Sequence, residues 1–395
     1  MTDKLTTRRP RRRLSSILCL DDFEIAARRH LPKPLFGYIA GASETNASLD
    51  NNRKSFGAYA FQPRVLRDVS GRSTETTLLN ERFAAPFGIA PMGISAVMAY
   101  RGDIMLARAA AESRIPMIMS GSSLIRMEDV ANAAPGAWFQ AYLPGEPERI
   151  DALVDRVAAA GFKTLVLTVD TAALANRENN IRAGFSTPLR PSLRLAWQGV
   201  SHPRWTAGTF LRTIVNHGIP HFENSFATRG APIISSNVMR DFGRKDHLNW
   251  SHLEQIRKRW GGNLVVKGIM HPDDAVQAVQ IGANGIIVSN HGGRQLDGTA
   301  APLQVLPAIV DRLNGAAPVM IDGGFRRGTD IMKALALGAK FAFIGRPFLY
   351  AAAVAGIPGI NRAIDIIQSE LHRNMALLGV TSVDAISGDH LRTSN

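Results

Sequence analysis

The chain has 395 residues, of which 45% are hydrophobic, so its length suits one large α/β barrel or two ordinary domains. The single cysteine, Cys19, excludes a disulfide framework and a cysteine-based metal site, and it indicates a reducing, cytoplasmic compartment. No run of about 18 uncharged apolar residues occurs and no signal peptide is visible, so no membrane-spanning helix is expected.

The net charge is +13, from 46 basic and 33 acidic residues, and part of the excess lies in the first 20 residues. We expect this basic tail, residues 1–20, to be disordered, with attraction to an anionic membrane surface as the alternative. Nucleic acid is not an expected partner, because the chain shows neither a recognition helix nor an aromatic stacking motif. Residues 21–395 are predicted to form a single domain.

The first predicted element is a helix over Asp22–His30, with Asp21 or Asp22 as its N-cap. It belongs to a helical extension that precedes residue 75. From Phe87 onward, short apolar runs alternate with helical patterns. The runs lack the alternation of a half-exposed strand, which is typical of strands buried on both faces. They are Phe87–Ala90, Met117–Ser120, Trp138–Tyr142, Thr164–Asp170, Leu264–Gly268, Gly285–Asn290, Pro318–Asp322 and Phe341–Gly345.

Amphipathic stretches lie between these runs, and several end at a glycine in a plausible C-cap position. Such alternation predicts an α/β fold of the TIM (β/α)₈ barrel type. An open doubly wound sheet would require a glycine-rich turn after the first strand, and Ala90-Pro91-Met92-Gly93 is not one. The helical stretches include Glu148–Ala160, Pro272–Gln280, Leu303–Leu313 and Thr329–Leu337, with Gly161, Gly282, Gly315 and Gly338 as the C-cap glycines.

Polar residues cluster at the carboxyl ends of the predicted strands, which in a barrel meet at one mouth. The step from Asp170 to Lys267 is much longer than the others, so we expect an insertion of roughly 60 residues after strand four, over about 183–245. The strand-end residues are Ser120, Gln140, Tyr142, Thr168, Asp170, Lys267, Ser289, His291, Asp322 and Arg346.

The segment Ser289–Gly298 joins a buried strand to a histidine, two glycines and an arginine. His291 can move a proton near neutral pH, and Arg294 can bind a carboxylate through two parallel hydrogen bonds. A nearby carboxylate would raise the pKa of such a histidine. The pattern favours a substrate whose carboxylate adjoins the carbon that reacts.

Two glycine-containing loops suit a phosphate group. Gly323-Gly324 follows strand seven and Gly345-Arg346 follows strand eight, where backbone N–H groups of such barrels bind phosphate. The phosphate could belong to a substrate or to a cofactor. Lys267 at the end of strand five is compatible with a Schiff base or with stabilisation of a reduced flavin.

The motif at Ser289–Gly298 resembles the signature of the FMN-dependent α-hydroxy-acid dehydrogenases and oxidases, which include L-lactate dehydrogenase, mandelate dehydrogenase and glycolate oxidase. The similarity runs from about Leu31 to Arg346. It implies an FMN-containing barrel that oxidises an L-2-hydroxy acid to the 2-keto acid. The other blocks that carry it are Leu31–Lys33, Trp138–Tyr142, Leu167–Asp170, Val266–Gly268 and Asp322–Gly328.

The resemblance also implies residue roles. His291 would be the catalytic base, Asp170 its supporting carboxylate and Lys267 the cation beside the flavin ring. Substrate would be bound by Tyr38, Tyr142, Arg177 and Arg294. The implied FMN contacts are Ala90, Pro91, Met92, Gly93, Ser120, Gln140, Thr168, Lys267, Ser289, Asp322, Gly323, Gly324, Arg326, Gly345 and Arg346; no metal site is implied.

Two departures bear on specificity. Ser122 stands where glycolate oxidase has a tryptophan, which favours a substrate larger than glycolate, such as L-lactate or an aryl acid like mandelate. Gly93 resembles the glycine of the dehydrogenase members, so we expect poor reaction of reduced FMN with oxygen and electron transfer to a quinone or another carrier. An oxygen-using oxidase of the same family is the alternative.

The insertion segment Ser201–Trp205 resembles that of the membrane-associated members, which suggests peripheral attachment at the inner face of the membrane. A lid over the barrel mouth is the alternative. By analogy with the family we also expect a homo-oligomer, a tetramer. Two other classes stay open: an aldolase-type barrel with Lys267 as Schiff base, and a flavin-binding protein without catalysis.

Overall fold

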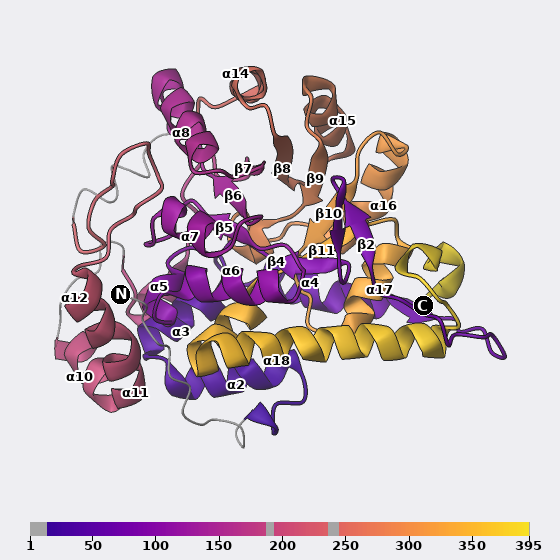
Figure 1. The fold of residues 1–395 in the computed structure, drawn as a ribbon, viewed down its shortest axis with the longest axis horizontal. Coiled ribbons are helices and arrows are strands. Elements are labelled where there is room, and N and C mark those ends of the chain that lie inside the picture. Colours follow the sequence, from indigo (N-terminus) through magenta and orange to yellow (C-terminus); the bar gives the residue numbers. More distant parts are fainter. Residues whose placement is uncertain (1–13, 187–192, 236–244, 395) are drawn as a thin grey trace.

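The computed structural model describes residues 14–186, 193–235 and 245–394. Its main sheet holds eight strands in the order β4-β11-β10-β9-β8-β7-β6-β5, and their pairings are parallel. A parallel bridge between Ile89 and Met117 links the two edge strands, so the sheet curves into a nearly closed barrel (Figure 1). The TIM-barrel prediction is confirmed, and the doubly wound alternative is wrong.

Each predicted strand is present within a few residues of its expected position. Strand β7 ends at Thr168, two residues earlier than expected, which leaves Asp170 in the loop at the barrel mouth. The barrel strands are β4 (Phe87–Ile89), β5 (Ile118–Ser120), β6 (Trp138–Ala141), β7 (Thr164–Thr168), β8 (Asn263–Ile269), β9 (Gly285–Val288), β10 (Val319–Asp322) and β11 (Phe341–Ile344).

Helices surround this sheet (Figure 1). Of the predicted C-cap glycines, Gly282 is the C-cap of its helix, whereas Gly161, Gly315 and Gly338 each follow the C-cap by one residue. All four have positive φ, which a residue without Cβ adopts at no steric cost. The helices are α5 (Ser95–Met98), α6 (Gly102–Glu112), α7 (Met127–Ala133), α8 (Pro147–Ala159), α14 (Trp250–Arg259), α15 (Pro272–Ile281), α16 (Pro302–Leu313), α17 (Gly328–Ala336) and α18 (Arg346–Leu378).

Apolar side chains fill the barrel interior. Trp138 and Phe343 pack against each other with ring centroids 5.6 Å apart, and Ile118, Val166 and Ile287 belong to the same buried cluster. A hairpin of β2 (Thr76–Leu78) and β3 (Glu81–Phe83) adds Leu78 and Phe83 at the amino-terminal end of the barrel. That end is closed by packing, so the polar carboxyl end is free to hold a site.

The N-terminal extension forms α2 (Leu20–His30), α3 (Lys33–Ala40) and α4 (Ala47–Lys54), and α2 packs along α18 (Figure 1). The predicted N-cap at Asp21 or Asp22 is wrong, because the helix begins earlier and Cys19 is its N-cap. Asp22 lies one turn inside, where its carboxylate accepts from the backbone N–H of Cys19 at 3.1 Å. Ile17 and Leu20 are buried, so packed structure reaches back beyond residue 20; residues 1–13 of the expected tail lie outside the described residues.

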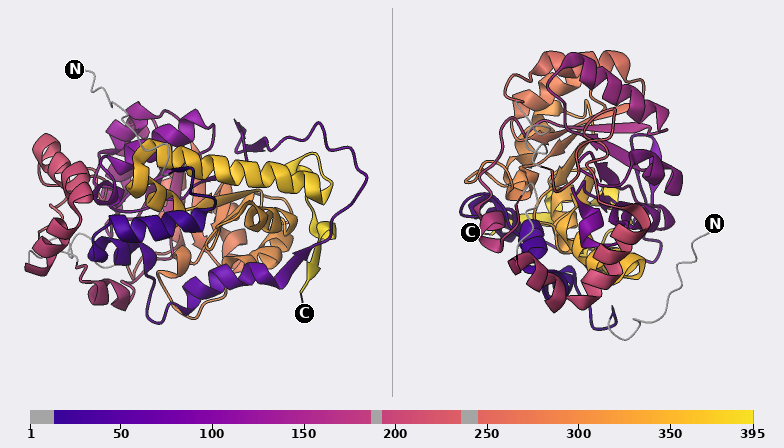
Figure 2. Two further views of the ribbon diagram at one scale, coloured as in Figure 1. Left: turned by 90° about the horizontal axis from the view of Figure 1, so that it is seen from below. Right: turned by 90° about the vertical axis from the view of Figure 1, so that its left-hand side faces the viewer.

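The insertion after β7 begins with α9 (Glu178–Ala183) and continues with α10 (Leu193–Ser201), α11 (Pro203–Trp205), the π-helical turn η2 (Thr206–Leu211) and α12 (Arg212–His217). Figure 2 shows α10–α12 projecting from one side of the barrel. A small antiparallel pair, β1 (Tyr59–Phe61) and β12 (Leu391–Thr393), joins the N-terminal region to the C-terminus.

Candidate active site

A cavity of about 590 Å³ opens at the carboxyl ends of the barrel strands. Its wall includes Tyr38 of α3, Tyr142 directly after β6, Arg177 directly before α9, and His291 and Arg294 of the turn after β9. The predicted base and the predicted substrate-binding residues therefore face one space, although they are far apart in the sequence.

His291 and Asp170 form a direct pair. The Nδ1 atom of His291 lies 2.8 Å from Oδ1 of Asp170, so Nδ1 carries the proton and donates it to the carboxylate. The other ring nitrogen, Nε2, lies 3.4 Å from the hydroxyl oxygen of Tyr142 on the cavity side. In this arrangement Nε2 is the lone-pair atom, which is the state that a general base requires.

An unusual backbone turn presents the imidazole. His291, Gly292 and Gly293 all have positive φ, at +58°, +63° and +76°. A left-handed conformation is costly for a residue with a side chain such as histidine, and strain of this kind concentrates at functional sites. The hydroxyl of Ser289 accepts from the His291 backbone N–H at 3.0 Å and helps to hold the turn.

Burial has the largest effect on the histidine's charge state. It lowers the pKa of His291 below the ordinary value, and Lys267 and Arg177 lower it further, whereas Asp170 raises it only in part. The upward pKa shift that Asp170 was expected to cause is therefore smaller than the downward shift caused by burial and the two cations. Burial raises the pKa of Asp170, but His291 and Lys267 more than offset this, so the net pKa of Asp170 is lowered. The resting pair is a neutral imidazole beside an ionised carboxylate.

Arg294 is positioned to bind an anion together with Arg177. One terminal nitrogen donates to the carbonyls of Tyr38 and Gly41 at 2.7 and 2.8 Å, and the guanidinium lies 4.7 Å from the centre of the Tyr38 ring. The other terminal nitrogen, NH2, is buried and has no hydrogen-bond partner among the described residues. Burial lowers the pKa of Arg294 to about 9, with a further contribution from Arg177. A carboxylate in the cavity would accept a hydrogen bond from the buried donor of Arg294 and would neutralise the charges of Arg294 and Arg177.

The crossing of helices α3 and α9 positions both Tyr38 and Arg177. Arg177 precedes α9 and donates to the carbonyl of Arg294 at 3.2 Å and to the side chain of Gln295 at 3.0 Å. Helix α3, which carries Tyr38, packs on α9 at Gly37, where a Cβ would come within 2.3 Å of the Cβ of Ala183. Only glycine permits this approach.

Lys267 is charged and held by two partners. Its ammonium lies 2.8 Å from Asp322 and 2.7 Å from the hydroxyl of Ser289, and both ionic side chains are nearly buried. A Schiff-base lysine must reach the neutral amine, which this ion pair opposes. The geometry therefore disfavours the aldolase-type alternative.

The sequence matches the family described as FMN-dependent dehydrogenase over residues 27–393. The chain belongs to this family. It is 38% identical to L-lactate dehydrogenase of Pseudomonas entomophila (strain L48) over 374 residues, which cover 94% of this chain and 97% of that protein.

Solved structures of the family superpose well. An (S)-mandelate dehydrogenase described as a monotopic membrane protein has a TM-score of 0.88 and 34% identity, over 96% of this chain and all of that chain. A mandelate oxidase with benzoyl-formic acid has a TM-score of 0.78 and 32% identity, over 95% of this chain and 98% of that chain.

The strand ends fit the FMN that this family requires. The amide nitrogen of Gln140, the hydroxyl of Thr168 and Oδ1 of Asp322 are buried and have no hydrogen-bond partner among the described residues. The other side of the Gln140 amide is occupied by the hydroxyl of Ser120 at 3.2 Å, which fixes its orientation. Unpaired buried polar groups are costly, so these atoms indicate a polar ring above them. The ring of FMN, placed at these strand ends, would satisfy them, and the loop 90–93 after β4 lines the same cavity.

The residues predicted to bind the phosphate of FMN are more engaged with the protein itself than the sequence suggests. Gly323 and Gly324 line the cavity, are half-buried, and have φ of +101° and +89°, a conformation that favours glycine. Arg346, however, donates to the carbonyls of Ile39, Gly292 and Gly41, and Arg326 lies 3.3 Å from Asp21 of α2. Both guanidinium groups line the cavity. Their contacts with FMN, like those of Gly345, stay predictions.

Three features of the site were not predicted from the sequence. Gly268 forms a bulge in β8 with φ of +104°, and a Cβ there would lie 2.8 Å from the Asp170 side chain. Asn290 exchanges two hydrogen bonds with buried Asn52 of α4, at 2.8 and 2.7 Å. Asp297 accepts from the N–H groups of Ser48 and Thr45 at the start of α4. For the Gly268 bulge, a glycine inside a predicted strand was an available signal. The contacts of Asn290 and Asp297 depend on the position of α4, which no sequence pattern predicted.

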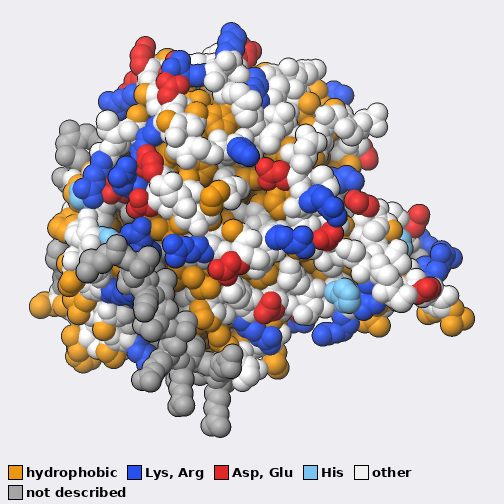
Figure 3. Space-filling model, in the orientation of Figure 1, with side chains coloured by type: hydrophobic (Ala, Val, Ile, Leu, Met, Phe, Trp, Pro, Cys, Tyr) orange, Lys and Arg blue, Asp and Glu red, His pale blue; other side chains and the backbone are white. Residues whose placement is uncertain are grey.

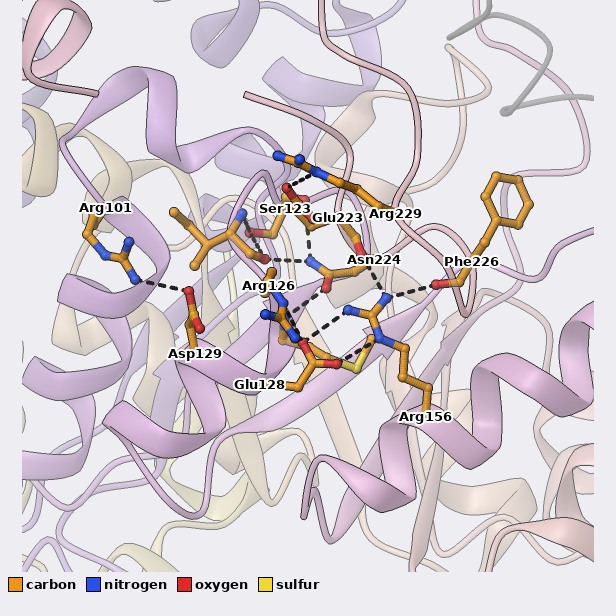
Figure 4. Close-up of polar contacts among 12 residues, drawn as sticks. Arg101, Ser123, Arg126, Glu128, Asp129, Arg156, Glu223, Asn224, Phe226 and Arg229 are labelled. Carbon is orange, nitrogen blue, oxygen red and sulfur yellow. Dashed lines mark hydrogen bonds and ion pairs between the residues drawn. The ribbon is translucent and has the colours of Figure 1, made fainter. Parts of the chain in front are cut away.

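The return segment of the insertion, residues 222–229, is fixed to the barrel wall (Figure 4). Arg156 of α8 donates to both carboxylate oxygens of Glu128 at 2.8 and 3.0 Å, and to the carbonyls of Glu223 and Phe226 at 2.8 and 2.9 Å. Glu223 also accepts from Arg229 at 2.9 Å. These contacts tie α7, α8 and the segment together.

Asn224 extends this anchoring to the substrate side of the cavity. It is 1% exposed, accepts from the Met127 N–H at 2.8 Å and donates to the carbonyls of Ser123 and Ile125 at 3.3 and 2.7 Å (Figure 4). Phe222, two residues before Asn224, lines the cavity, as does Ser122, which precedes Ser123. The apolar wall contributed by the insertion is therefore attached to the loop after β5.

The membrane interpretation of Ser201–Trp205 needs a correction. Trp205 is 8% exposed, donates its indole N–H to the carbonyl of Val97 at 2.9 Å and stacks on Phe210, so it anchors the insertion to the barrel. The exposed apolar residues of the insertion instead include Leu193, Trp197 and Val200, which recur at helical spacing on one face of α10. Figure 3 shows hydrophobic side chains gathered at the lower left, where α10–α12 lie. Within the described residues, no helix is long and apolar enough to span a membrane.

Proposed function

We propose that this protein oxidises an L-2-hydroxy acid to the 2-keto acid, and that the reaction takes place between His291 and the two arginines. The observation that carries the proposal is the joint placement in one cavity of an unprotonated Nε2 on His291 and a buried N–H on Arg294 that has no partner among residues 14–186, 193–235 and 245–394. The substrate gives up two electrons and two protons, and FMN bound at the strand ends supplies the electron acceptor.

Each residue then has a defined task. Arg294 and Arg177 bind the substrate carboxylate and so present one face of the α-carbon, which is the proximity contribution to the rate. Nε2 of His291 accepts a proton, and Asp170 stabilises the imidazolium that forms. Tyr142, whose pKa is raised mainly by burial, stays protonated and can donate a hydrogen bond to the substrate.

The substrate is expected to be larger than glycolate. The cavity wall beyond the catalytic pair includes Ser122, Leu174, Phe185, Phe222 and Ile233. Apolar walls of this kind bind apolar groups by removing them from water. Long-chain and aryl 2-hydroxy acids, mandelate included, therefore fit better than glycolate.

Steady-state rates with an artificial dye as acceptor test this function. A panel of L- and D-2-hydroxy acids, from glycolate to mandelate, should show activity with L isomers only and kcat/KM that rises with side-chain size. Equal rates with both isomers, or no rate with any acid on flavin-loaded protein, would contradict the proposal.

We further infer that the exposed face of α10 binds the membrane surface and brings the enzyme to a quinone acceptor. Aromatic and aliphatic side chains beside basic residues suit the interface between headgroups and acyl chains. The exposed fractions of Leu193 and Trp197 are 92% and 67%, whereas Trp205 is buried.

Sedimentation with anionic lipid vesicles tests the attachment. The double variant Leu193→Ser, Trp197→Ser should no longer sediment with the vesicles. The control Leu377→Ser makes the same kind of change at an exposed residue of α18 and should still sediment with them. Equal sedimentation of both variants would count against α10 as the binding face.

A further inference from the structure

Lys245 is a cation of the cavity wall that neither the catalytic pair nor the carboxylate clamp uses. It follows the insertion, lines the cavity and lies with its ammonium 5.1 Å from the centre of the Tyr142 ring. Two residues later, His247 donates to the carbonyl of Gly145 at 2.7 Å, which fixes this stretch over the loop that follows Tyr142.

The ammonium has no counter-ion in the part of the chain that the structure describes. It makes neither an ion pair nor a hydrogen bond with a described residue, and burial alone lowers its pKa to about 8. The adjacent carboxylate, Asp246, also borders the cavity, but its side chain is 73% exposed and lies 3.9 Å from Nδ1 of His247 rather than on Lys245. Removing a lysine charge from water without a partner is unfavourable, so the cavity favours an anion at this point.

Lys245 does not belong to the arginine pair that would bind the substrate carboxylate. Its ammonium lies over the ring of Tyr142. Arg294 instead donates to the carbonyls of Tyr38 and Gly41, and Arg177 donates to the carbonyl of Arg294 and to Gln295. Phe222 and Ile233 line the same cavity as Lys245, so the apolar chain of a substrate held by Arg294 and His291 can pack on this wall while its end meets Lys245.

We propose that Lys245 binds a second carboxylate, at the end of the substrate side chain, and that the enzyme prefers 2-hydroxy acids with an apolar chain ending in a carboxylate. The inference rests on the proposed function, since it assumes that the first carboxylate occupies the arginine pair. An ion pair in this partly desolvated position would be stronger than one at the surface.

The test compares two acids that differ only at the chain end. 2-Hydroxyadipate ends in a carboxylate and 2-hydroxyhexanoate in a methyl group, and the quantity is the ratio of their kcat/KM values. We expect a ratio above one for the wild type, a fall of roughly tenfold or more in Lys245→Met, and a ratio largely kept in Lys245→Arg. The control Lys163→Met removes an exposed charge outside the cavity and should leave the ratio unchanged.

A binding measurement separates this inference from the proposed function. Titration of the FMN-loaded protein with 2-oxoadipate and 2-oxohexanoate, followed by flavin absorbance, gives dissociation constants without turnover, and their ratio should shift in the same direction. An unchanged ratio in Lys245→Met, or a wild-type preference for the methyl-ended acids, would overturn the role of Lys245 and leave the oxidation standing. Absence of oxidation with any acid would instead overturn the proposed function, while the titration still tests Lys245.

Discussion

The crossing of α3 and α9 offers a sharp test of how the substrate site is positioned. In Gly37→Ala the new Cβ would lie 2.3 Å from the Cβ of Ala183, whereas ordinary contacts begin near 3.4 Å. Helix α3 must therefore move by about 1 Å, and it carries both Tyr38 and the carbonyl that accepts from Arg294 at 2.7 Å. A misplacement of about 1 Å can cost roughly 100-fold in rate, and overpacking costs about 1–3 kcal/mol in stability.

The assay is kcat/KM with an artificial dye, together with the denaturant midpoint of the FMN-loaded protein. We expect a fall of roughly 10- to 100-fold in kcat/KM for Gly37→Ala. The compensating change Ala183→Gly removes the clashing atom and leaves the next neighbours 3.8 and 3.9 Å away, so the double variant should recover most of the activity. Wild-type kcat/KM in the single variant, or no recovery in a folded double variant, would refute this reasoning.

Three further predictions follow from individual contacts. Asp170→Asn removes the charge that stabilises the imidazolium, so kcat should fall by roughly 100-fold or more while FMN stays bound; a wild-type kcat would exclude the role. Oxygen uptake with an L-2-hydroxy acid should be far slower than dye reduction by the same protein, as expected from Gly93, and equal rates would identify an oxidase. The hydrogen bonds from the start of α4 lower the pKa of Asp297 to about 2 against the opposing effect of burial, so its stabilisation is present above about pH 4 and is lost as the pH falls toward 2. Asp297→Ala should therefore cost about 1 kcal/mol at pH 7 and less at pH 3.5 in urea unfolding, and a loss that grows toward low pH would contradict it.

The barrel and its mouth were predictable because their signals are local. Doubly buried strands read as short apolar runs, and the residues at their carboxyl ends share the mouth by geometry alone. The positions of His291, Asp170 and Lys267 followed from that rule. Their interactions did not, since the sequence cannot show that Lys267 is paired with Asp322 or that burial outweighs Asp170 in setting the pKa of His291.

The insertion was the least predictable part. Trp205 and Trp197 are equally aromatic in the sequence, and only packing shows that one is an anchor and the other is exposed. The same holds for Asn224 and Arg156, whose bonds to backbone carbonyls depend on segments about 70 to 100 residues away. No sequence motif includes Lys245, and only its position over the ring of Tyr142 in the structure points to a role.

Anaerobic mixing of the FMN-loaded protein with an L-2-hydroxy acid tests most directly whether His291 and the arginine pair drive the oxidation. The yellow flavin absorbance should bleach in the wild type, and at least about 100-fold more slowly in His291→Gln. Bleaching of the variant at the wild-type rate, or an unbleached wild type with every L acid of the panel, would contradict the assignment of this site.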